Sequence, residues 1–114
     1  MSHLSILPTV LRDAEVLAAS LRSLGFTPLP GQVLQGFAEE TVQVDVALNL
    51  ERDLWIGWRS ESDGGLTLVG DLQRLSKHHR LQTLLGQITR AYAAHQALID
   101  AASQLPQAKL HIRV

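Results

Sequence analysis

The 114-residue chain has no cysteine, a low aromatic content of 4% and no long apolar run. The absence of thiols excludes disulfides, thiolate metal sites and a cysteine nucleophile, although it assigns no cellular compartment. The apolar runs fall far short of the ~18 residues that a membrane span requires. The N-terminus also lacks the cationic region and apolar stretch of a signal peptide. We therefore expect a soluble, cytoplasmic protein.

The charge balance is nearly even, with a formal net charge of −1 at pH 7. No global field therefore favours nucleic acid or an anionic membrane surface as a partner. Hydrophobic residues make up 46% of the chain and charged residues 18%, which is typical of globular proteins. We expect a single domain over residues 1–114 that buries about two-thirds of the surface its extended chain exposes.

The central residues 41–72 predict a three-stranded antiparallel meander. Residues 51–53 form a charged turn after the first strand, and residues 54–60 and 66–70 are the next two strands. Between those two, Gly64 and Gly65 supply the positive-φ positions that hairpin turns need. In the first strand, a period of two places five aliphatic side chains on one face: Val42, Val44, Val46, Leu48 and Leu50.

The residues before the meander predict two strands and a helix. Residues 1–8, in which Leu4 and Ile6 alternate before Pro8, predict a short strand at a sheet edge, because Pro8 cannot donate a ladder hydrogen bond. Asp13 can cap a helix that runs to about residue 24, where Gly25 follows as a C′ residue. Residues 32–37 predict another strand, in which Gly36 indicates a bulge or a close backbone approach.

The residues after the meander predict a long helix and a last strand. Residues 81–103 have helical periodicity, with His95, Leu98 and Ile99 on the apolar stripe, and Pro106 ends the helix. The pattern leaves open whether residues 71–104 form one broken helix or two. Residues 109–114 predict a final alternating strand with its apolar side chains inward.

The predicted order is β-α-β-β-β-β-α-β, which favours an α+β fold over a parallel α/β fold. We expect one mostly antiparallel sheet with two helices packed on one face. The other face would then be uncovered and largely polar, with one tryptophan and five further residues: Gln43, Asp45, Asn49, Arg59 and Thr67.

Short motifs in a fixed order span nearly the whole chain: the opening Met-Ser-His-Leu-Ser, Leu24-Gly25, Val44-Asp45-Val46, Ile56-Gly57, Leu68-Val69-Gly70-Asp71, Gln87 and Ala91-Tyr92-Ala93. In order and spacing they resemble the hypothetical chloroplast reading frame 35 family, a domain-of-unknown-function family of cyanobacteria and plastids. The resemblance implies a setting in the cyanobacterial cytosol or the plastid stroma, and no established reaction. Family members often end the last meander strand with Val-Ala-Asp-Trp. This chain keeps the Asp as Asp71 and has Leu72 in place of the Trp.

Asp71, His78 and His79 form one local cluster with metal-like chemistry, because carboxylates and imidazoles suit divalent metals. Adjacent histidines on a helix point about 100° apart, unlike the i, i+4 pair of a zinc helix. We therefore interpret them as structural or solvated, and we expect His95 to be buried with a hydrogen-bond partner. We predict no catalytic residue, cofactor or metal site.

Two features could carry an interface. Residues 74–80 are a short basic run that could contact phosphate or an acidic partner, but no aromatic residues interleave with it for base stacking. Trp55 and Trp58 are three residues apart and therefore lie on opposite faces of their strand. One tryptophan should be in the core, and the other is the better interface candidate because tryptophan is enriched at binding hot spots.

The leading hypothesis is a non-enzymatic interaction or adaptor protein whose exposed sheet face or edge binds another protein or a second copy. The alternative is nucleic-acid or ribonucleoprotein binding through the basic run, against which the net charge and low aromatic content stand. An enzyme or small-ligand site at Asp71, His78 and His79 is a third hypothesis. The candidate interface residues are Trp55, Trp58, Arg59, Asp71, Arg74, Lys77, His78, His79 and Arg80.

Overall fold

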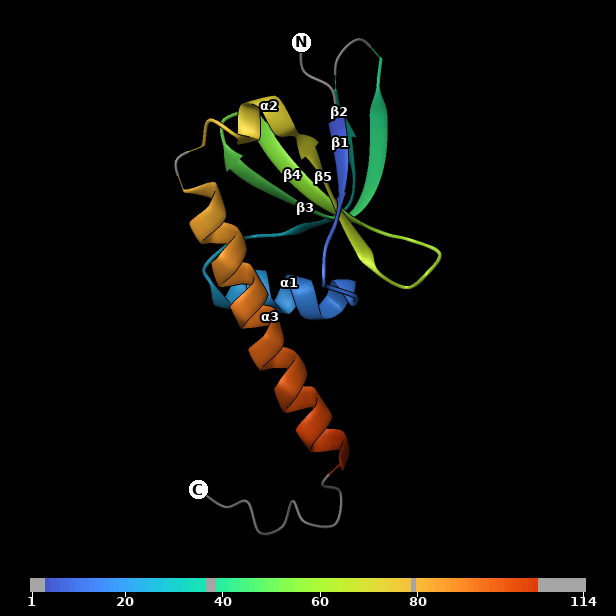
Figure 1. The fold of residues 1–114 in the computed structure, drawn as a ribbon, viewed down its shortest axis with the longest axis vertical. Helices are drawn as coiled ribbons and strands as arrows, with labels where there is room; N and C mark the ends of the chain where they lie inside the picture. Colours follow the sequence, from blue (N-terminus) through green and yellow to red (C-terminus); the bar gives the residue numbers. More distant parts are fainter. Residues whose placement is uncertain (1–3, 37–38, 79, 105–114) are drawn as a thin grey trace.

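The computed structural model describes residues 4–36, 39–78 and 80–104, and it confirms an α+β fold with an antiparallel sheet. The elements in chain order are β1 (Leu4–Pro8), α1 (Ala14–Ser23), β2 (Leu29–Gln35), β3 (Thr41–Glu51), β4 (Leu54–Ser60), β5 (Leu66–Asp71), α2 (Leu72–Leu75) and α3 (Leu81–Gln104). The five strands lie in the order β1-β5-β4-β3-β2, so β1 and β2 are the two edges (Figure 1). The predicted strand at residues 109–114 lies outside the described residues.

The meander forms as its turn signals predict. Ala47 pairs with Gly57 and Gly57 with Val69, which places three consecutive strands side by side. Arg52 takes a positive φ of 42° in the first turn, and Gly64 takes a φ of 89° in the second. The second value lies in the region that glycine enters without a steric penalty.

The hydroxyl group of Tyr92 in α3 holds the two residues that precede α1. The Asp13 side chain caps α1 by accepting from the backbone N–H groups of Glu15 and Val16 at 2.8 and 3.2 Å. Tyr92 of α3 accepts from the N–H groups of Arg12 and Asp13 at 3.1 and 2.9 Å. These backbone donors precede the helix and have no partner within it, so the tyrosine fixes where α1 begins.

One face of the sheet packs against the helices and forms the larger core, as predicted. Trp58 and Ile56 of β4 are 1% and 0% exposed and pack with Leu17 of α1 and Ile88 of α3. Gly70 lets α2 lie close to this face, because a Cβ there would be 2.6 Å from a methyl carbon of Leu75. The residues that follow β5 form two helices, α2 and α3, rather than one broken helix.

The opposite face is partly covered, which corrects the expectation of an open polar surface. Val44 and Val46 of β3 are both buried, yet Val46 belongs to the helix-side core and Val44 to a second cluster with Leu34 of β2. The alternation of β3 therefore changes face, and Figure 1 shows the β2–β3 hairpin turning away from the rest of the sheet. The prediction that all five aliphatic residues of β3 share one face is wrong.

Gly57 marks the place where this hairpin touches the sheet. A Cβ at Gly57 would lie 2.8 Å from both γ-methyl groups of Val44, so only a glycine leaves room for that valine. The second cluster is small, with four buried residues and three partly buried ones: Leu34, Val44, Ala47 and Val69, with Leu4, Val42 and Trp55.

The last turns of α3 extend beyond the core. Its buried residues are Leu84, Ile88 and Tyr92, whereas Leu98 and Ile99 are 71% and 49% exposed. The apolar stripe predicted over residues 81–103 therefore continues for several turns without a covering element among the described residues. His95 is half-buried, with Nδ1 at 3.0 Å from the carbonyl oxygen of Ala91. No helix among the described residues has the length and apolar character to cross a bilayer.

Candidate binding groove

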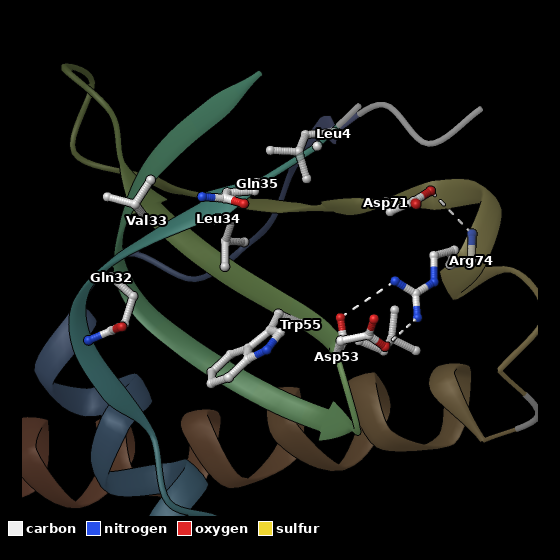
Figure 2. Close-up of a pocket in the computed structure, with 11 residues that line it drawn as sticks. Leu4, Gln32, Val33, Leu34, Gln35, Asp53, Trp55, Asp71 and Arg74 are labelled. Atoms are coloured by element: carbon white, nitrogen blue, oxygen red, sulfur yellow. Dashed lines mark hydrogen bonds and ion pairs between the residues drawn. The ribbon is translucent and has the colours of Figure 1, made fainter. Parts of the chain in front are cut away.

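A pocket of about 550 Å³ lies between β2 and the sheet face opposite α1 and α3. We call it the β2 groove, and its lining includes Leu34 and Gln35 of β2, Trp55 of β4, and Leu4. Figure 2 shows β2 passing over this face, with Leu34 pointing toward the sheet and Trp55 lying below. The groove exists because β3 bends: the bend holds an edge strand above the sheet instead of level with it.

The two tryptophans lie on opposite faces of the sheet, as their spacing predicts. Trp58 is buried in the helix-side core and cannot contact a partner, so it is removed from the candidate interface. Trp55 is half-buried, packs against the second cluster and lines the β2 groove. Its indole therefore combines partial burial with access from solvent, which is the usual situation of an aromatic anchor at an interface.

An ion pair forms the wall of the groove at the α2 end. Arg74 Nη2 lies 3.1 Å from Asp53 Oδ1, and this hydrogen bond is the largest cause that holds the pKa of Asp53 below its ordinary value. Both side chains are exposed, at 45% and 86%, so water screens the pair. The backbone N–H of Arg74 donates to Asp71 Oδ1 at 3.2 Å. Asp71 thus positions the start of α2, and Asp53 positions the guanidinium group of Arg74.

The opposite end of the groove is closed where the two edge strands meet. The backbone N–H of Leu4 in β1 donates to Glu40 Oε1 at 2.9 Å. A Cβ at Gly36, which directly follows β2, would lie 2.9 Å from Leu4 Cγ. Gly36 thus provides the close backbone approach that the sequence indicated. At this point β1 limits access to the end of β2, and the residues that follow β2 limit access to the start of β1.

The basic run does not form one continuous surface. Arg74 is engaged with Asp53, and His78 Nε2 lies 3.7 Å from Glu51 Oε1. Lys77 and Arg80 are exposed, and neither lines the groove. Two carboxylates from outside the run thus contact the segment that was expected to attract phosphate, and His79 is outside the described residues.

Arg59 is held away from the groove by its own partners. Its guanidinium group lies 2.9 Å from Glu61 Oε2, and Thr67 donates to that same oxygen at 2.7 Å. The hydrogen bonds from Thr67 and Arg59 lower the pKa of Glu61. Arg59 is half-exposed but fully engaged in this small network, so it is a weaker interface candidate than Trp55.

The predicted metal-like cluster is not assembled by the described part of the chain. Asp71 caps α2, while the Nε2 atom of His78 is directed toward Glu51. Among residues 4–36, 39–78 and 80–104, no group of three or more histidine or acidic side chains could hold a metal ion. The described residues therefore do not bring Asp71 and His78 together as one cluster.

Sequence reasoning placed Trp55, Asp71 and Arg74 among the candidates but did not connect them with β2. The missed residues are those of the covering strand and the near edge, among them Leu34 and Leu4. The available signal was the pair Gly36 and Gly57, because each marks a position where another backbone or side chain approaches closely.

The fold and the groove together define a small α+β domain with a bent antiparallel sheet and a pocket beneath one edge strand. Residues 20–107 match the model of a family described as protein of unknown function (DUF1257). This match covers more than half of the chain, and the chain belongs to this family. No curated protein and no solved structure matches it.

Proposed function

We propose that this protein is a non-enzymatic interaction module that binds an extended segment of a partner protein in the β2 groove. The observation that carries the proposal is an edge strand held above an accessible tryptophan. A strand added to β2 gains main-chain hydrogen bonds, and alternate side chains of the added strand reach the cleft. Trp55 and Leu34 supply its apolar surface, and the Asp53–Arg74 pair supplies a polar end.

The size of the groove supports a peptide ligand. A volume of about 550 Å³ falls within the ~300–1,000 Å³ that is usual for ligand pockets. The β2 strand is seven residues long, and all but two of its residues are exposed. Strand edges of this kind promote pairing with another chain unless a protein blocks them. Among the described residues, Leu4 approaches one end of β2 at Gly36 and Pro30 has no N–H to donate near the other, so the stretch available for pairing is residues 31–35.

The setting of this function is also a proposal. The motifs shared with the chloroplast reading frame 35 family support a role in cyanobacteria or plastids, in the cytosol or stroma. The nucleic-acid alternative is less well supported by the geometry, because Glu51 and Asp53 contact two of the basic groups. A salt-sensitive RNA complex that disappears when Arg74, Lys77 and Arg80 become Glu would favour that alternative.

The experiment is a selection of linear peptides from a displayed library on the full chain, followed by affinity measurements on variants. We expect selected peptides to bind about 30-fold more weakly to Trp55→Ala, because loss of a hot-spot aromatic costs about 2 kcal/mol or more. Val10→Ala is the matched control, since Val10 is 78% exposed and lies outside the groove. Peptides that bind Trp55→Ala as tightly as the parent would contradict the proposal.

A further inference from the structure

The two edge strands of the sheet differ in what they offer to an incoming strand. In β1, the backbone N–H of Leu4 donates to Glu40 Oε1 and therefore faces away from β5. Backbone groups of a strand alternate in direction, so Ile6 and Pro8 face the same way as Leu4. The N–H of Leu4 is engaged and proline has none, so within Leu4–Pro8 the outer edge offers the N–H of Ile6 alone.

The outer edge of β2 offers more main chain. The N–H of Gly36 donates to the carbonyl oxygen of Glu40 at 2.8 Å, so the backbone of Gly36 faces β3. The same register continues into β2, where Gln35 lies opposite Thr41 and Val33 opposite Gln43. Gln35 and Val33 are out of phase with Gly36, so their N–H and C=O groups point away from β3. Both residues are exposed, Val33 at 55%.

The register also determines which side chain of an added strand would enter the β2 groove. In paired strands, residues directly opposite each other have their side chains on the same face. Leu34 lies between the two outward-facing residues, is buried, and packs in the second cluster with Trp55 and Leu4. Figure 2 shows it pointing toward the sheet. The residue of the added strand opposite Leu34 would therefore place its side chain beside Leu34, toward Trp55.

The charges around the groove do not favour a charged ligand. Residues 23–38, which include all of β2, contain no acidic or basic side chain. In the groove wall, Arg74 is paired with Asp53, and Asp71 is buried and accepts from the backbone N–H of Arg74. A charged ligand residue would have to displace one of these internal partners, so charge complementarity favours an uncharged segment.

We propose that the partner segment is an uncharged extended stretch that pairs through its main chain with Val33 and Gln35 and places one apolar side chain opposite Leu34. This inference rests on the proposed function, because it names the class of partner that the same groove binds. The main-chain bonds fix the register, and the single apolar side chain provides the contact with Trp55.

The first test scans N-methylation along a selected peptide and measures binding to the full chain by fluorescence anisotropy. A methyl group on a nitrogen that faces β2 removes a hydrogen bond and blocks the approach of the strand. We expect about tenfold weaker binding at such positions and less than about a twofold change at the residues between them. The sensitivity should therefore alternate with a period of two residues.

The second test changes the protein at one outward-facing residue. Val33→Pro removes an N–H group that makes no bond to β3, and proline is tolerated at such positions of edge strands. We expect this variant to remain folded by circular dichroism and to bind the peptide about tenfold more weakly. Val33→Ala is the matched control: it shortens the same side chain but keeps the N–H group, so it should bind more tightly than Val33→Pro.

The third test concerns charge. The selected peptides should lack charged residues at the position opposite Leu34 and on either side of it. Their affinity should change less than about twofold between about 50 and 500 mM NaCl, because salt screens only charged contacts.

The outcomes separate this inference from the proposed function. Peptides that depend on Trp55 but tolerate N-methylation at every position would overturn the inference, as would charged peptides that salt weakens about tenfold. Either result would leave the groove as a binding site that recognises side chains. The absence of any peptide that depends on Trp55 would remove both proposals.

Discussion

The two faces of this sheet are made by the same strands and differ in what covers them. On one face, α1 and α3 exclude water from Trp58, Ile56 and Leu48, which are at most 2% exposed. On the other face, the cover is a two-stranded hairpin, and a groove remains beside the small cluster around Val44. A helix brings a broad apolar stripe to a sheet, whereas a hairpin of narrow strands covers only part of it.

The difference separates stability from recognition. Burial of apolar surface contributes about 25 cal/mol per Å², so the larger helix-side core should dominate the free energy of folding. The hairpin side buries fewer residues and leaves Trp55 accessible, so its substitution should affect binding more than folding. The pair of tryptophans in β4 tests this assignment directly, because both belong to the same strand.

The largest expected effect is on the helix side. We expect Trp58→Ala to lower the free energy of unfolding by about 3–5 kcal/mol, as large-to-small substitutions in a packed core do. Trp55→Ala should cost only about 1 kcal/mol, near the average for single substitutions, because its side chain is half-buried. Chemical denaturation of both variants measures the comparison. Equal losses would show that the hairpin side is as important for folding as the helix side.

The second expected effect concerns the contact that holds the hairpin on the sheet. Gly57→Ala should destabilise the protein by about 1–3 kcal/mol, because its methyl group would overlap the γ-methyl groups of Val44. The same variant should lose peptide binding, since displacement of Val44 moves the strand that covers the groove.

The control for that variant is Gly86→Ala in α3. A Cβ at Gly86 would meet only the far end of the Arg90 side chain at 3.4 Å, which can move. Because alanine is favoured over glycine inside helices by about 1 kcal/mol, Gly86→Ala should leave stability unchanged or raise it. If both alanine variants are equally tolerated, the Val44–Gly57 contact does not hold the hairpin in place.

Local sequence patterns predicted the helix-covered face well. The Asp13 cap, the period of α1 and the turn at Gly64 each depend on interactions between near neighbours in the chain. The α+β class and the placement of Trp55 and Trp58 on opposite faces also follow from the periods of helix and strand. The sequence did not reveal the bend of β3. From Val42 to Leu50 every second residue is aliphatic, and this pattern continues unchanged across the bend.

The β2 groove could not be predicted for a related reason. It joins Leu4, Leu34, Trp55 and Arg74, which come from four different elements. The bend in β3 brings β2 over the other three elements, and the bend depends on contacts between distant residues such as Val44 and Gly57. The sequence also did not predict that α3 extends beyond the core. An apolar stripe that includes Leu98 and Ile99 predicts burial whether or not another element covers it.

The smallest expected effect is electrostatic and belongs to the groove wall. The pKa of Asp53 is lowered in the folded protein, chiefly by the hydrogen bond from Arg74, so the folded state binds its proton less readily than the unfolded state. The stabilisation is therefore fully present above the unfolded pKa of about 3.9 and is lost as pH falls through the lower folded value. Both groups are exposed, so we expect a small contribution that salt weakens.

Arg74→Met tests this assignment through its pH dependence. The variant should be slightly less stable than the parent at neutral pH, and the two unfolding free energies should converge as the solution is acidified below the pKa of Asp53. In an Asp53→Asn background the same substitution should produce no pH-dependent difference, because the titrating group is gone. If Arg74→Met still lowers the free energy of unfolding in that background, by the same amount at every pH, then Arg74 acts by packing its side chain against the groove rather than by its charge. The groove wall would then resemble the helix-covered face, where packing rather than charge determines stability.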